Sequence, residues 1–168
     1  MGCLRRSEIA GLCLNDGEEV KGYIQHDTDG LFIHLNKSKS GKSDEDNTSR
    51  FIPFASNPLL CPVRALDVWL ELLEEQQNKI FVTIGRHDNI DYSSTIVGDT
   101  VNRIIKKYFG KDFSGHSLRV GSAVTARLNG ADMESIRIMG GWETDTMPRR
   151  YTKQTDIKKN TAAFKLGL

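Results

Sequence analysis

The hydrophobic and polar positions divide the chain into a strand-rich first part and a helical remainder. Leu4 to Leu12 combines good helix formers with a short apolar face and predicts a helix that ends near a glycine. Two β-rich runs follow, Glu19 to His26 and Leu31 to Leu35, and the turn between them contains glycine and has hairpin length. The polar stretch Asn36 to Ser49 leads into a third β-like run, Arg50 to Pro53. We therefore expect a small three-stranded antiparallel sheet near the N-terminus.

The rest of the chain has the spacing of amphipathic helices, with apolar residues three and four positions apart. The predicted helices are Pro62 to Glu75, Thr95 to Phe109, His116 to Leu128 and Met133 to Met139. Shorter helices are predicted at Asp145 to Thr152 and Ile157 to Leu166. The expected fold class is α+β, mostly helical, in one domain, because 168 residues suit a single hydrophobic core.

Composition narrows the class of protein but does not reveal its partner. The net charge of +1 gives no reason by itself to expect nucleic acid, although basic residues gather in several short groups. Cys3, Cys13 and Cys61 match no zinc spacing and cannot all pair, so we expect reduced thiols in a cytoplasmic protein. No apolar run has the length of a membrane span. We expect no membrane association, no metal and no small-molecule cofactor.

The residues that are the best candidates for a functional site lie between Ser114 and Tyr151. His116 and Arg119 lie one turn apart on a predicted helix, and Arg119 is a charge among apolar residues there. Trp142 follows two glycines, and Tyr151 comes nine positions later. Each residue alone also suits a structural role, such as a helix cap, a core aromatic or an exposed ring. Their order and spacing together favour a functional site.

These residues resemble the tyrosine recombinase and phage integrase family. Gly115 to Arg119 resembles the His-x-x-Arg box, and Gly140 to Trp142 resembles the third box, with the tryptophan of Cre-like members. Leu4 to Ile9 resembles the first arginine box, in whose register Arg5 rather than Arg6 is catalytic. Ile33 to Ser40 resembles the hairpin that delivers a lysine, and we align that residue to Lys39. Lys37 and Lys42 remain alternatives.

The resemblance implies a role for each position. Arg5 and Arg119 would flank one phosphate, since a guanidinium fork suits two of its oxygens. His116 would support them by donating a hydrogen bond or moving a proton. Tyr151 would attack phosphorus, for which its phenol, with an ordinary pKa of about 10, needs surrounding cations or a base.

The remaining roles are supporting ones. Lys39 would protonate the leaving 5′-hydroxyl, and Trp142 would donate its indole N–H to a phosphate oxygen. Glu8 would brace Arg5. Further DNA contacts are expected from Arg6, Lys37, Lys42, Arg149 and Arg150.

The implied protein is a site-specific DNA recombinase or integrase that works through a 3′-phosphotyrosine, as a tetramer on double-stranded DNA and a monomer when free, in the cytoplasm at the nucleoid. Residues 1–168 would be the catalytic domain, truncated at the N-terminus relative to family members, and residues 152–168 a tail that packs on a neighbouring protomer or on its own domain. Three alternatives stay open: a type IB topoisomerase, a catalytically silent DNA-binding fragment, and an unrelated helical interaction module.

Overall fold

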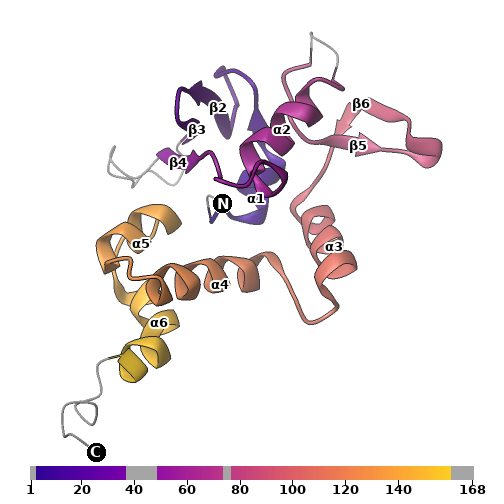
Figure 1. Ribbon diagram of the computed structural model, residues 1–168. Coiled ribbons are helices and arrows are strands. Elements are labelled where there is room, and N and C mark those ends of the chain that lie inside the picture. Colours follow the sequence, from indigo (N-terminus) through magenta and orange to yellow (C-terminus); the bar gives the residue numbers. More distant parts are fainter. Residues whose placement is uncertain (1–2, 37–48, 74–76, 160–168) are drawn as a thin grey trace, which may run out of the picture.

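The computed structural model describes residues 3–36, 49–73 and 77–159, and a four-stranded sheet forms its N-terminal half (Figure 1). The strand order is β1-β2-β3-β4, with β1 parallel to β2 and the other pairs antiparallel. The elements of this half are α1 (Arg6–Ala10), β1 (Leu12–Cys13), β2 (Gly22–Asp27), β3 (Gly30–Leu35), β4 (Ser49–Pro53), the 3-10 turn η2 (Pro58–Leu60) and α2 (Pro62–Leu70). The three predicted strands are present, but the sheet has a fourth.

The missed strand, β1, lies where the sequence predicted the end of a helix. α1 stops at Ala10, and Leu12 and Cys13 are fully buried beside β2. Two residues are too few to show the alternation that marks a strand, so their apolar character extended the predicted helix instead. α2 also ends earlier than predicted, at Leu70 rather than Glu75.

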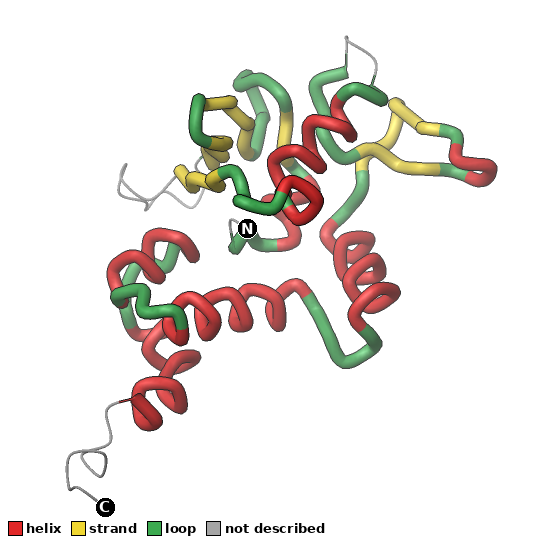
Figure 2. The backbone as a smooth tube through the Cα atoms, viewed as in Figure 1, coloured by secondary structure: helices red, strands yellow, loops and turns green. Residues whose placement is uncertain are grey.

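The second half is helical apart from one hairpin. Its elements are β5 (Val82–Ile84), the 3-10 turn η3 (Arg86–Asp88), β6 (Ile90–Thr95), α3 (Gly98–Phe109), α4 (Gly115–Leu128), α5 (Met133–Gly140) and α6 (Thr146–Lys159). The β5–β6 hairpin was not predicted, because β6 alternates between exposed and half-buried positions with few apolar side chains. Thr95 consequently ends a strand and does not start a helix. Figure 2 shows this hairpin standing apart from the helices that follow it.

Two hydrophobic clusters hold the molecule together. The first joins the sheet to α2, and its buried members include Leu31, Ile33, Val63 and Ile80. The second joins α4, α5 and α6 around Ala123, Ile136 and Trp142. In Figure 1 the three helices of the second cluster group on one side of the sheet and α1. β4 and α5 contact one another where the two clusters meet.

The last helix differs from its prediction. α6 runs without a break from Thr146 to Lys159, whereas two short helices were expected, because the sequence between them has no glycine or proline to stop it. Its buried face is formed by Pro148, Thr152 and Thr155, while Ile157 is more than half exposed. Residues 160–168, the rest of the predicted tail, lie outside the described residues.

The described residues contain neither a membrane-spanning helix nor a metal-binding cluster. Among residues 3–36, 49–73 and 77–159, no helix has the length and apolarity needed to cross a bilayer. In the same ranges no three side chains of the metal-binding types His, Cys, Asp and Glu gather closely enough to hold an ion. The three cysteines are free and buried.

Candidate functional site

The start of α4 is fixed by two capping interactions. The backbone N–H of Ser117 donates to Ser114 Oγ at 3.3 Å, and the Gly115 N–H donates to Asn102 Oδ1 of α3 at 3.0 Å. These bonds satisfy amide groups that the first turn of a helix leaves without partners. They also set the direction of the next two functional side chains, His116 in the first turn and Arg119 one turn later.

Arg119 is a buried cation at the centre of the cluster. Its side chain comes from α4, the whole residue is 8% exposed, and Nη1 donates to the Cys3 carbonyl. The guanidinium carbon lies 4.4 Å from the centre of the Trp142 ring, a cation–π distance. Burial lowers the pKa of Arg119, the Arg5 cation lowers it further, and Glu8 and Tyr151 act in the opposite direction. Because the ordinary pKa of arginine is above about 12, Arg119 keeps its charge.

Trp142 is held by the turn that ends α5. A side chain at Gly140 would overlap the indole ring, so glycine is required for the ring to pack against the helix end. Gly141 has a left-handed backbone with φ of 59°, which glycine adopts without strain. The two glycines before Trp142 therefore let its ring fold back over Arg119.

Tyr151, in α6, lies close to both His116 and Trp142. Its ring centre is 5.7 Å from that of His116, with the rings nearly perpendicular at 76°. The Trp142 ring centre is 6.0 Å away. Tyr151 is half-buried against the second hydrophobic cluster, while His116 is exposed. Three helices thus bring His116, Arg119, Trp142 and Tyr151 into one cluster.

Arg5 approaches this cluster from the other hydrophobic core. It stands immediately before α1, where its backbone N–H donates to Glu8 Oε2 at 2.6 Å and its Nη1 donates to Glu8 Oε1 at 2.6 Å. The side chain is 61% exposed, so this ion pair is worth little to stability. Arg119 reaches the same segment, since its Nη1 donates to the carbonyl of Cys3, two residues before Arg5, and the Arg5 cation contributes to lowering the pKa of Arg119. Two arginines from opposite halves of the chain therefore share one region, beside a carboxylate.

The other predicted DNA contacts are distributed more widely. Lys39, Lys37 and Lys42 lie outside the described residues. Arg6 donates to Asp99 Oδ1 at 3.0 Å and packs on Gly115 at the start of α4.

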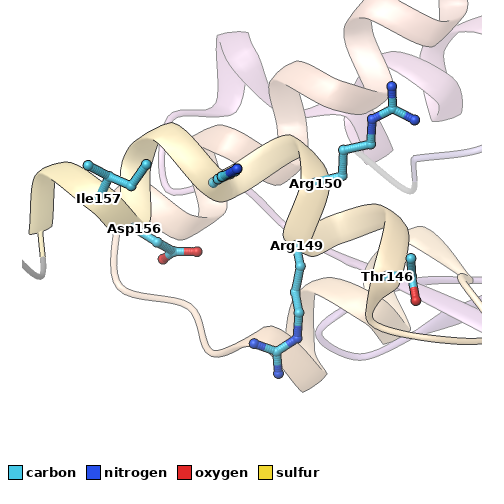
Figure 3. Close-up of a pocket in the computed structure, with 6 residues that line it drawn as sticks. Thr146, Arg149, Arg150, Asp156 and Ile157 are labelled. Carbon is cyan, nitrogen blue, oxygen red and sulfur yellow. The ribbon is translucent and has the colours of Figure 1, made fainter.

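On α6, Arg149 donates to Asp145 Oδ2 at 3.0 Å, whereas Arg150 is exposed. Figure 3 shows these two arginines leaving the helix in different directions beside a shallow pocket on α6. That pocket is open and basic, lined also by Lys153.

One charged residue near the cluster was missed from the sequence. Arg50 of β4 is 4% exposed, on the same inward face as Ile52, and its guanidinium lies against Gly141. The sequence contained a signal for it, since Arg50 is a charge two positions from an inward-facing apolar residue of a predicted strand. The same reasoning had singled out Arg119 on its helix.

The helix that carries Tyr151 is tied to α4 by an ion pair. Arg127 Nε donates to Asp156 Oδ1 at 2.5 Å, and Thr152 Oγ1 donates to Asp156 Oδ2 at 3.2 Å. The hydrogen bond from Arg127 is the main reason that the pKa of Asp156 is lowered from its ordinary value of 3.8. The pair is about one quarter exposed on each side. It fixes α6 one turn beyond Tyr151.

Replacing Asp156 with asparagine is expected to lower the free energy of unfolding by about 1 kcal/mol at neutral pH. Because the folded-state pKa of Asp156 is depressed, its contribution is present above the ordinary value of 3.8 and is lost as the pH falls through the folded pKa. The difference in the free energy of unfolding between wild type and Asp156→Asn should therefore disappear in strong acid. Urea unfolding at neutral pH and at about pH 3 measures this. The control is Asp99→Asn, whose carboxylate is 87% exposed, and an equal loss in that variant would contradict the assignment.

The chain is similar to a curated protein in sequence and to solved structures in fold. No family model matches the chain. It is 29% identical over 167 residues to a curated protein, the integrase/recombinase XerD homolog of Selenomonas ruminantium, covering 96% of this chain and 46% of that protein. The structure is similar to XerA recombinase, with a TM-score of 0.61 at 18% identity over 95% of this chain and 54% of that one. The chain therefore shares its fold with about half of XerA recombinase.

A second solved structure agrees with this assignment. The Tn1549 transposon integrase in complex with circular intermediate DNA matches with a TM-score of 0.52 at 18% identity, over 95% of this chain and 56% of that one. The chain thus spans about half the length of the relatives it matches. The chain is thus similar in sequence to a protein named as an integrase/recombinase and in fold to a recombinase and an integrase.

Proposed function

We propose that this chain is the catalytic domain of a site-specific DNA recombinase or integrase that cleaves and rejoins DNA strands through a 3′-phosphotyrosine on Tyr151. The observation that carries the proposal is the convergence of Tyr151, His116, Trp142 and Arg119 from three helices, with Arg5 adjacent. Because Cre-like members carry a tryptophan at this position, Trp142 would group the chain with them inside the family.

The geometry supports a division of labour around one phosphate. Arg119 and Arg5 would bind its non-bridging oxygens and stabilise the charge that grows there during attack. Tyr151 Oη forms the new bond to phosphorus, the bond from phosphorus to the 5′-oxygen breaks, and the 5′-hydroxyl leaves with a proton from Lys39. His116, whose ring centre lies 5.7 Å from that of Tyr151, would accept the phenol proton as Tyr151 attacks. One ester replaces another, so the chemistry requires neither nucleotide hydrolysis nor metal.

DNA binding would depend mainly on the phosphates. The arginine side chains near the site can contact backbone oxygens but do not by themselves read bases, so affinity should fall as salt rises. A tetramer on two duplexes completes the proposal, with the part of the 152–168 tail beyond the buried Thr152 and Thr155 contacting a neighbouring protomer.

The experiment uses a pool of DNA duplexes of random sequence that carry a 5′-bridging sulfur at one phosphate. A thiol leaves without a proton, so the substrate traps a covalent adduct independently of the lysine. We expect an adduct that survives detergent and maps to Tyr151 by mass spectrometry. Relaxation of supercoiled plasmid by the isolated chain would favour the topoisomerase alternative. DNA binding without any adduct would favour the silent fragment.

A further inference from the structure

Arg50 is a buried arginine that the proposed mechanism does not use. It lies in β4, opposite Ile33 of β3, and is 4% exposed although its guanidinium is charged. Its Nη1 donates a hydrogen bond to the carbonyl of the preceding residue Ser49 at 3.4 Å. Burying a cation is costly, so a position that holds one needs a reason beyond packing. Its surroundings indicate that reason.

The guanidinium of Arg50 occupies the space that a side chain at Gly141 would fill. A methyl group built on Gly141 would overlap the guanidinium, so glycine there serves both the left-handed backbone and the approach of Arg50. Gly141 comes directly before Trp142. From another direction, Arg137 Nη1 donates to the carbonyl of Trp142 at 3.3 Å. Arg50 therefore contacts the turn that carries Trp142 from the sheet, and Arg137 contacts it from α5.

Arg50 also belongs electrostatically to the site. Burial lowers its pKa, Glu8 opposes that change, and the cations of Arg119 and Arg5 lower it further. Glu8, Arg119 and Arg5 thus contribute to the electrostatic environment of the Arg50 guanidinium, beside its direct contact with Gly141.

We propose that Arg50 is a positioning residue of the site: packed against Gly141, it fixes the end of α5 on β4 and so holds the Trp142 ring over Arg119. The effect on DNA cleavage rests on the proposed function, whereas the effect on Trp142 does not. Arg50 would also link the sheet, which contributes to the first hydrophobic cluster, to the end of α5, which contributes to the second.

The first test compares Arg50→Met, Arg50→Lys and a control, Arg103→Met, which removes an exposed arginine of α3. Methionine fills similar space but lacks the charge and the hydrogen bond to Ser49, so Arg50→Met is expected to melt slightly lower than wild type and to stay folded at the assay temperature. Its rate of adduct formation should nevertheless fall by at least about tenfold, since small misplacements of catalytic groups are costly. Affinity for DNA should change by less than about twofold. Arg50→Lys should restore part of the rate.

The second test follows Trp142 directly, without DNA. In the full chain labelled with 5-fluorotryptophan, Trp69→Phe identifies which of the two fluorine resonances belongs to Trp142. Arg50→Met is expected to shift that resonance, and Arg103→Met is not. Gly141→Ala should shift it too, because the added methyl group overlaps the Arg50 guanidinium. Gly130→Ala is the matched control, because Gly130 also has a positive φ but an added side chain there meets no atom within 4 Å.

Two results would overturn the proposal. One is a Trp142 resonance that does not move in Arg50→Met. The other is a lower melting temperature with an unchanged adduct rate per folded molecule, which would make Arg50 a purely structural residue. If wild type itself forms no adduct, the proposed function fails, and the Trp142 resonance still decides whether Arg50 positions the turn.

Discussion

Replacing Tyr151 with phenylalanine is expected to abolish the covalent adduct, lowering its rate of formation by at least about 10³-fold, while DNA affinity stays within about twofold of wild type. Only the hydroxyl oxygen is lost, and the ring contacts with His116 and Trp142 remain available. The fold should therefore be unchanged, with a free energy of unfolding within about 1 kcal/mol of wild type. Trapping on the sulfur-bridged duplexes measures the adduct, and fluorescence anisotropy measures binding.

The matched control is Tyr108→Phe, since Tyr108 is a tyrosine of α3 that is 72% exposed. It should form the adduct at the wild-type rate. An adduct of undiminished yield in Tyr151→Phe would assign the nucleophile to another residue and remove the main support for the proposed mechanism.

Replacing Arg119 with methionine is expected to slow adduct formation by about 10²–10³-fold, the usual cost of losing one preorganised donor to a developing negative charge. Arg119→Lys should lie between this variant and wild type, because lysine keeps the charge but lacks the planar fork that bonds two phosphate oxygens. Single-turnover rates at saturating DNA isolate the chemical step from binding. Thermal unfolding in parallel corrects each rate for the folded fraction.

Arg127 provides the control for this series. It lies on the same helix as Arg119 but bonds to Asp156, away from Tyr151. Arg127→Met should lower the free energy of unfolding and leave the rate of adduct formation per folded molecule unchanged. Equal rates for Arg119→Met and wild type would mean that the buried guanidinium only supports Trp142 and the Cys3 carbonyl.

Much of the architecture was predictable because its signals are local. The bounds of α4 and α5 were predicted to within one residue, since each has an apolar stripe and its N-terminus is capped by Ser114 or Asp132. His116, Arg119, Trp142 and Tyr151 also lie in one continuous stretch of the sequence, so their order and spacing were visible without the structure. The structure places these four together, while their chemical roles stay predictions.

What the sequence did not reveal depends on contacts between distant segments. β1 forms because Leu12 and Cys13 pair with β2, and two residues are too few to show the alternation of a strand. Arg50 was missed because its importance comes from Gly141, more than ninety positions later. α6 buries two threonines and a proline instead of the apolar residues that an amphipathic pattern favours, since small side chains suit its close approach to α4.

Under the proposed function, the junction between the two hydrophobic clusters would restrict DNA cleavage to molecules in which both parts are folded. Arg5 and Arg50 belong to the part built on the sheet, whereas Arg119, Trp142 and Tyr151 belong to the part built from α4, α5 and α6. Under the proposed function, a chain in which either part has come loose carries a nucleophile without its full set of cations. Only a completely assembled molecule would then be able to break a strand, and damaged or half-folded copies would be harmless to the genome around them.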